Sequence, residues 1–187
     1  MPNEIAIVFG ASGFLGSHVV EALSAEGYRV RLFDRSPSPY RQPDQEMILG
    51  DIMNLEEVTK AAKGAAVVYN FAAIADIDEA HKKPLATAAV NILGNMNVLE
   101  AARLAGARRF VFASSVYVYS KSGSFYRASK QAAERFIETY HECYGLDYSI
   151  LRYGSLYGRR TDTRNGIYRM LHEAVEKHSI TYQGSGE

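Results

Sequence analysis

Short apolar runs alternate along the chain with longer segments in which apolar residues recur at helical spacing. A short apolar run bounded by turn-forming residues is typical of a buried strand, whereas the longer spacing indicates an amphipathic helix. Strands are predicted at residues 5–9, 28–33, 46–49, 66–70, 108–113, 147–151 and 179–182. Helices are predicted at residues 14–26, 54–62, 84–105, 126–144 and 164–178.

The order of these elements indicates the fold class. Repeated strand–helix–strand units with apolar strands predict an α/β fold, a doubly wound parallel sheet of the Rossmann type with helices on both faces. Asp76, Asp78 and Glu79 follow the fourth strand, and we interpret them as a solvated acidic loop. The glycines expected to end helices in a left-handed conformation are Gly27, Gly64, Gly106 and Gly145.

A glycine-rich turn, Gly10-Ala-Ser-Gly13-Phe-Leu-Gly16, joins the first strand to the first helix. Glycines serve any tight turn, but here strand, turn and helix follow one another as a dinucleotide site requires. Gly10 permits the sharp turn, Gly13 lets a pyrophosphate approach the backbone, and Gly16 lets the helix pack on its strand. The free N–H groups of the helix start can then bind phosphate oxygens.

Acidic residues follow the second and third strands. Asp34 can accept hydrogen bonds from both hydroxyls of an adenosine ribose and would repel a 2′-phosphate, which favours NAD over NADP. The adjacent Arg35 opposes that preference, because a guanidinium can receive the extra phosphate. Asp51 either accepts from an adenine amino group or belongs to the cap region of the helix near Asn54, and both interpretations stay open.

Hydroxyl and amine side chains collect where the predicted fifth strand leaves the sheet. Ser115 lies at this carboxyl edge, where open α/β sheets bind ligands, and can donate to an oxygen whose charge changes during hydride transfer. Tyr126 and Lys130 are four residues apart at the start of the next helix, on one of its faces. A nearby ammonium and the helix N-terminus favour phenolate, so the pKa of Tyr126 is predicted to be lowered.

Composition narrows the function classes. The 187 residues are 47% hydrophobic, and Lys+Arg and Asp+Glu balance at 21 each. A balanced charge provides no field for nucleic acid or an anionic membrane, so neither is predicted as a partner. The single cysteine, Cys143, fits a reducing compartment and is expected to pack within its helix. No signal-like segment begins the chain and the histidines lack ligand spacing, so we predict a cytoplasmic protein without a metal.

The motifs together resemble the extended short-chain dehydrogenase/reductase family, in particular its NAD-dependent nucleotide-sugar epimerases and dehydratases. The resemblance runs through nearly all of the chain and corresponds to the N-terminal part of the family. Its supporting segments include Asn70-Phe-Ala-Ala73, Val90-Asn91-Ile-Leu-Gly94, Ser114-Ser115-Val-Tyr-Val-Tyr119, Tyr126-x-x-x-Lys130 and Leu151-Arg-Tyr-Gly-Ser-Leu-Tyr-Gly158.

The resemblance implies a role for particular positions. Ser115, Tyr126 and Lys130 match the catalytic trio of the family, and Tyr126 and Lys130 also reach the cofactor. The remaining positions that match NAD contacts are Gly10, Gly13, Phe14, Leu15, Gly16, Asp34, Asp51, Ile52, Phe71, Ala72, Ala73, Asn91 and Tyr153, with Arg35 beside them. Ser115, Ser155 and Asn165 are implied to contact a nucleotide-sugar substrate.

The resemblance also implies the domain organisation. Residues 1–187 form an NAD-binding Rossmann-type domain, in which residues 153–178 contribute the start of the substrate-binding region. Most of a smaller C-terminal substrate lobe is expected to be absent, because Tyr182–Glu187 matches a segment after which the family continues. The long helices form a dimer bundle in the family, which implies a homodimer.

Two positions and one loop depart from the family pattern. Ser155 replaces the usual Asn and Arg159 replaces the usual Pro, which weakens the implied diphosphate or sugar contact. The interval between Ser115 and Tyr126 is short for the family, so the mouth of the substrate site is expected to be reshaped.

The implied mechanism begins with Tyr126, as phenolate, removing a proton from a sugar hydroxyl while hydride passes to NAD. The transient keto intermediate is then reduced from its other face by an epimerase, or loses water in a dehydratase. Family dehydratases commonly carry Asp-Glu after the catalytic Ser or Thr, and Val116-Tyr117 at this place favours an epimerase. Two alternatives stay open: an NAD(P)-dependent carbonyl reductase of the same superfamily that releases its cofactor, and a non-catalytic NAD-binding module.

Overall fold

The structure is a computed structural model that describes residues 4–163 and 165–181. Contacts within the chain divide it into two compact units, Met1–Arg152 and Tyr153–Glu187. The first unit carries a six-stranded sheet, and the second carries helix α7 (Gly166–Lys177).

The first unit consists of strands separated by helices, except that the second and third strands follow one another without a helix, and most boundaries lie close to the predicted ones. The strands are β1 (Ile5–Phe9), β2 (Arg29–Asp34), β3 (Glu46–Leu49), β4 (Ala65–Asn70), β5 (Arg109–Ser115) and β6 (Tyr148–Tyr153). The α-helices are α1 (Phe14–Ala25), α2 (Leu55–Ala62), α3 (Ile77–Lys82), α4 (Pro84–Ala88), α5 (Asn95–Leu104) and α6 (Ser124–Tyr144). A π-helix, η1 (Ala89–Gly94), joins α4 to α5, and a 3-10 helix, η2 (Val116–Tyr119), follows β5.

The strand order is β3-β2-β1-β4-β5-β6. Strand β1 pairs in parallel with β2 and β4, and β2–β3 and β4–β5 are parallel as well. The chain therefore builds outward from β1 first in one direction and then in the other. In open α/β sheets this reversal leaves a crevice at the carboxyl ends of the two central strands, which is where ligands bind. The predicted doubly wound Rossmann-type fold is confirmed.

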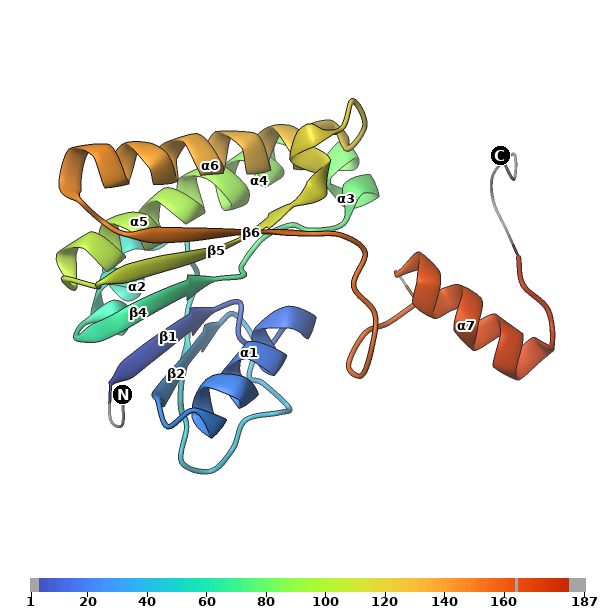
Figure 1. Ribbon diagram of the computed structural model, residues 1–187, viewed down its shortest axis with the longest axis horizontal. Coiled ribbons are helices and arrows are strands. Elements are labelled where there is room, and N and C mark those ends of the chain that lie inside the picture. Colours follow the sequence, from blue (N-terminus) through green and yellow to red (C-terminus); the bar gives the residue numbers. More distant parts are fainter. Residues whose placement is uncertain (1–3, 164, 182–187) are drawn as a thin grey trace. The chain divides into compact units, whose positions relative to one another are not determined.

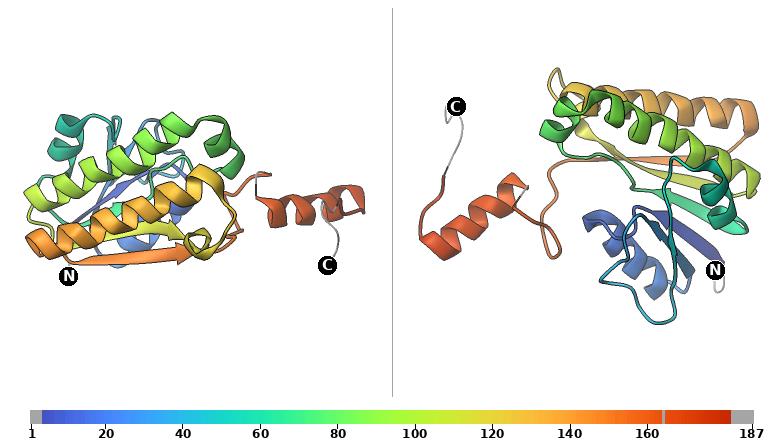
Figure 2. Two further views of the ribbon diagram at one scale, coloured as in Figure 1. Left: turned by 90° about the horizontal axis from the view of Figure 1, so that it is seen from above. Right: turned by 180° about the vertical axis from the view of Figure 1, so that it is seen from behind.

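Helices cover both faces of the sheet, with α1 on one face and α5 and α6 on the other (Figure 1). Side chains alternate between faces along a strand, and in β1 Ile7 and Phe9 join the core that includes α2, α5 and α6 residues. Ala6 and Val8 join the core that Val20 of α1 completes. Helices α5 and α6 lie side by side (Figure 2). Because both faces of such a strand are buried, apolar residues follow one another along it without interruption.

The predicted helix over residues 84–105 is three contiguous helical segments, α4, η1 and α5. A π-helical turn is wider than an α-helical one and is frequent at functional sites. Asn91 and Gly94 in this turn are buried. A Cβ on Gly94 would lie 2.7 Å from Ile52 Cδ1, so glycine lets the helix approach the loop after β3.

The acidic loop expected after β4 is wrong, because residues 77–82 form helix α3. The Asp76 carboxylate accepts a hydrogen bond from Glu79 N at 2.8 Å and so caps this helix. Glu79 in turn pairs with Lys83 at 2.9 Å. The acidic side chains here start and hold a helix.

Two expectations near the end of the chain also fail. Residues 179–181 contain no strand, and the rest of the segment predicted around Tyr182–Glu187 lies outside the described residues. Cys143 is exposed on α6 rather than packed in the core. Within the part of the chain that the structure describes, no helix is long and apolar enough to cross a membrane.

Candidate active site and cofactor cleft

The glycine loop lies at the crevice between β1 and β4. Gly10 has a φ of +78°, and a Cβ there would lie 2.6 Å from Ala72 N, so the turn accepts only glycine. A Cβ on Gly16 would lie 2.1 Å from Gly10 O, so α1 reaches its strand only without a side chain at this position. Packing within the protein explains both glycines.

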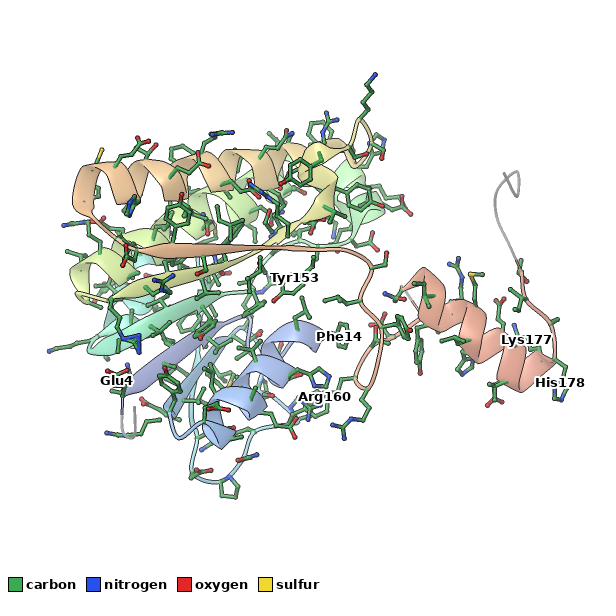
Figure 3. The ribbon with its side chains drawn as sticks, viewed as in Figure 1. Glu4, Phe14, Tyr153, Arg160, Lys177 and His178 are labelled. Atoms are coloured by element: carbon green, nitrogen blue, oxygen red, sulfur yellow. The ribbon has the colours of Figure 1, made fainter. Side chains whose placement is uncertain are left out.

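Packing within the protein does not require glycine at position 13. Gly13 is the exposed N-cap residue of α1, and a Cβ there would meet only Gly10 O, at the ordinary contact distance of 3.4 Å. Phe14 and Leu15 follow in the first helical turn, where backbone N–H groups have no acceptor within the helix. Figure 3 shows Phe14 at this end of α1, remote from Glu4 at the start of β1. The exposed turn is a cradle that fits a pyrophosphate.

A cavity opens beside the loop at the ends of four strands. Its lining residues are Gly10, Gly13, Phe33, Asp34, Arg35, Gly50, Asp51, Ile52, Phe71, Ala72, Ala73, Ile74 and Val90. Most of the residues predicted to bind the cofactor are therefore neighbours in space, although they come from separate parts of the sequence.

Asp34 connects the end of β2 to the glycine loop. Its Oδ2 accepts from Ser12 N at 3.0 Å, and its Oδ1 accepts from Ser36 N at 3.3 Å. A carboxylate has about four acceptor positions, so capacity remains for ribose hydroxyls. Arg35, which is exposed, borders the same cavity.

Asp51 does not cap α2. The N-cap is Asn54, whose Oδ1 accepts from the backbone N–H groups of Glu56 and Glu57. The Asp51 Oδ1 accepts from Met53 N at 3.0 Å and closes the turn that precedes the helix. Asp51 lines the cavity, and the adenine contact stays a prediction.

The Asn91 side chain makes three hydrogen bonds within the protein. Its Oδ1 accepts from Ile74 N at 2.8 Å, and its Nδ2 donates to Ile74 O at 3.0 Å. The same Nδ2 donates to Ser129 Oγ on α6 at 2.9 Å. The π-helix thus fixes the cavity wall at Ile74 and connects it to the helix that carries Tyr126.

Ser115, Tyr126 and Lys130 come from the end of β5 and the first two turns of α6. Ser115 Oγ accepts from Tyr117 N at 3.3 Å, and the Ser115 side chain lies close enough to Tyr126 to lower the pKa of its phenol. The Tyr117 ring meets the Tyr126 ring edge-on at a centroid distance of 6.4 Å. The structure therefore brings the predicted hydroxyl pair together.

Lys130 is buried beneath this pair. Its Nζ donates to Ala113 O at 2.7 Å and lies 4.6 Å from the Phe112 ring centroid and 5.7 Å from the Tyr126 ring centroid. Burial lowers the Lys130 pKa to about 8, and the negative charge of Glu134 opposes that change. Lys130 is therefore protonated at neutral pH, close to the pH at which it loses its charge.

The predicted lowering of the Tyr126 pKa is wrong. Burial raises the pKa because it disfavours the phenolate, and the Ser115 side chain acts in the opposite direction but less strongly. Tyr117 adds a smaller raising contribution. The sequence showed the neighbouring positive charge but not the depth of burial.

The sequence reasoning missed a group of polar side chains behind Lys130. Glu134, one helical turn further along α6, is buried and accepts from Ser114 Oγ. Arg152 of β6 donates to both of its oxygens, at 3.0 and 2.8 Å, and also donates to the Tyr119 hydroxyl. A signal was present, because Tyr126, Lys130 and Glu134 share one face of a helix.

The second unit carries the other predicted contact positions. Ser155 is exposed, and burial raises the pKa of Tyr153. Asn165 caps α7, since its Oδ1 accepts from Tyr168 N at 3.0 Å. Their contacts with cofactor or substrate stay predictions. Across the described residues of both units, no three His, Cys, Asp or Glu side chains are grouped to hold a metal ion.

Comparison with known families agrees with this geometry. Residues 6–187 match the profile of the NAD dependent epimerase/dehydratase family. The chain belongs to this family. Membership confirms the resemblance seen in the motifs and agrees with the predicted cofactor, NAD.

Individual relatives differ in their reported activities. The chain is 31% identical over 176 residues to a putative UDP-glucose 4-epimerase of Methanocaldococcus jannaschii, covering 84% of this chain and 58% of that protein. It is 29% identical over 193 residues to a 3-beta-hydroxysteroid dehydrogenase of Mycolicibacterium neoaurum, covering 90% and 51%. The UDP-glucose 4-epimerase of Thermus thermophilus in complex with NAD matches with a TM-score of 0.83 at 29% identity, covering 92% and 63%. The chain thus spans less than two thirds of each protein.

Proposed function

We propose that this chain is the NAD-binding and proton-transfer part of a nucleotide-sugar epimerase. The observation that carries the proposal is the joint position of Ser115, Tyr126 and Lys130 at the sheet edge that also holds the glycine loop. The similarity to proteins described as UDP-glucose 4-epimerases supports the nucleotide-sugar as substrate.

The residues of the cleft fit the cofactor. The exposed turn at Gly13 and the first N–H groups of α1 would hold the pyrophosphate, and Asp34 would accept from the adenosine ribose. Lys130 and Tyr126 would hold the nicotinamide ribose. When bound, NAD would accept and return a hydride and add a positive ring charge to the site.

Proton transfer is assigned to Tyr126. Its phenolate takes a proton from a sugar hydroxyl as the sugar is oxidised, and the phenol so formed returns a proton as the ketone is reduced from the opposite face. Ser115 donates to the sugar oxygen and stabilises its changing charge. As an ammonium, Lys130 favours the phenolate and so acts against the burial that raises the Tyr126 pKa.

The residues after Ser115 favour an epimerase over a dehydratase. Loss of water from a keto sugar needs an acid and a base near the leaving hydroxyl. The η2 segment carries Val116 and Tyr117 at the first two positions after Ser115, and neither is a carboxylate. Sugar epimerisation needs no carboxylate in this segment, because Ser115 and Tyr126 supply the required hydroxyl groups.

Tyr126→Phe tests the proposal. The ring and the helix start are kept, so stability and NAD affinity should remain near normal, while hydride transfer should slow by about 10²–10⁴-fold. The measurement is single-turnover reduction of bound NAD by saturating UDP-, dTDP- and GDP-sugars. Tyr144→Phe, which removes an exposed hydroxyl from the same helix, is the matched control. Hydride transfer that survives in Tyr126→Phe would remove Tyr126 as the base.

A second candidate is an alcohol dehydrogenase activity that releases its reduced cofactor. The similarity to a 3-beta-hydroxysteroid dehydrogenase favours it, because such an enzyme needs the same proton-transfer groups. An epimerase returns its hydride and accumulates no free NADH. Release of NADH in proportion to product, or loss of NAD on dialysis, would favour the dehydrogenase.

A further inference from the structure

Glu134 is a buried carboxylate to which the proposed reaction assigns no task. It is 5% exposed and lies one turn beyond Lys130 on the face of α6 that carries Tyr126. Burial of a carboxylate is unfavourable unless its oxygens are bonded. Here both oxygens are bonded, through Ser114 and Arg152.

These bonds hold the strand that presents Ser115. Lys130 Nζ donates to Ala113 O at 2.7 Å, and the Ser114 hydroxyl donates to Glu134. Two successive turns of α6 therefore bind two successive residues of β5, immediately before Ser115. A shift of the Lys130 or Glu134 side chain would move Ser115 relative to the phenol of Tyr126.

The surrounding charges make Glu134 a counter-charge for Lys130. The ionisable groups around the two side chains are Tyr126 beside Lys130, exposed Arg135 and Arg152 beside Glu134, and Tyr119, whose hydroxyl accepts from Arg152. Burial lowers the Lys130 pKa and the Glu134 charge raises it. Arg152 balances part of the Glu134 charge, since it donates to both carboxylate oxygens.

We propose that Glu134 is a positioning residue of the site, which fixes the end of β5 through Ser114 and supplies the negative charge that keeps buried Lys130 protonated. Its importance for turnover rests on the proposed function, whereas its effect on Lys130 does not. The two can therefore fail separately.

The test is an NMR titration of the protein carrying ¹³C-labelled lysine, with the Lys130 resonance assigned by its loss in Lys130→Met. In Glu134→Gln the side chain keeps its shape and loses its charge, so the Lys130 pKa should fall by about one pH unit. In Arg152→Gln the Glu134 charge is no longer balanced, so the Lys130 pKa should rise. Opposite changes from two variants of one cluster are not expected from general loosening of the fold.

Glu138→Gln is the matched control, because Glu138 lies on α6 one turn further and pairs with exposed Arg135. It should leave the Lys130 pKa within about 0.2 of the unmodified protein. An equally small change in Glu134→Gln, or a fall in Arg152→Gln, would overturn the proposal. If Glu134→Gln does not fold, the direction of change in Arg152→Gln alone decides. Opposite pKa changes in a protein that never oxidises a nucleotide-sugar would overturn the proposed function and leave this role of Glu134 in place.

Discussion

The glycine loop and the β5–α6 edge are held together by different interactions. At the loop, backbone atoms approach so closely that a Cβ on Gly10 or Gly16 would lie within 2.6 Å of another backbone atom. At the β5–α6 edge, buried ionisable side chains are held by hydrogen bonds, as Lys130 is by Ala113 O and Glu134 by Arg152. One region depends on shape and the other on charge.

This difference decides how each region responds to change. Backbone atoms in a tight turn cannot move aside, so an added methyl group acts on the fold itself. Buried charges respond to pH and to their partners while the backbone stays in place. Substitutions in the loop should therefore act through loss of stability, and substitutions at the β5–α6 edge through altered protonation.

The largest expected effect lies in the loop. Gly16→Ala places a Cβ 2.1 Å from Gly10 O, and we expect the free energy of unfolding to fall by at least about 3 kcal/mol. Gly13→Ala meets no atom closer than 3.4 Å and should lose at most about 1 kcal/mol as a helix cap. Urea denaturation measures both.

Gly13→Ala also sharpens the comparison within the loop. Because its methyl group would occupy the proposed pyrophosphate site, NAD affinity measured by calorimetry should fall at least about tenfold while the fold persists. Equal stability losses in the two variants, or normal NAD affinity in Gly13→Ala, would show that internal packing does not separate these glycines.

The second effect is the pH dependence caused by Lys130. Its pKa is about 8 when folded, against 10.5 as the ordinary value, so between these two pH values the unfolded chain binds more protons. Stability relative to Lys130→Met should therefore rise with pH across this interval, by about 3 kcal/mol in total, because one pH unit is worth about 1.4 kcal/mol.

Lys121→Met, which replaces an exposed lysine, corrects for alkaline changes shared by all variants. The comparison uses urea denaturation of the three proteins from about pH 7 to 10.5. A stability difference between the unmodified protein and Lys130→Met that stays constant over this range would contradict the burial of a charged Lys130.

The fold was predictable because its signals are local. Apolar runs and helical spacing located the strands and long helices of the sheet, and the glycine turn located the crevice. Helix α3 is six residues long and shows little periodicity, and acidic residues favour both loops and helix starts. The π-helical turn was missed because it depends on the approach of Gly94 to Ile52, which sequence spacing does not show.

The site was predictable only as far as its motifs extend. Tyr126 and Lys130 are neighbours on one helix, so their spacing was sufficient. Glu134 depends on Ser114 and Arg152, which come from two different strands. The pKa of Tyr126 depends on burial by the folded chain, and the sequence therefore indicated the wrong direction.

The smallest expected effect lies at Asp34, where a charged side chain supports the glycine turn and so combines the features of both regions. Its Oδ2 accepts from Ser12 N, so Asp34→Ala would remove the support of the turn together with the negative charge. Asp34→Asn keeps an acceptor for Ser12 and removes the charge that repels a 2′-phosphate, while Arg35 remains to receive it. In Asp34→Asn the preference for NAD should therefore narrow by about 1–2 kcal/mol, measured as the difference between calorimetric affinities for the two cofactors. Equal affinities for NAD and NADP in the unmodified chain, or an unchanged preference in Asp34→Asn, would mean that the loop discriminates by shape alone and that Asp34 is only a support for its turn.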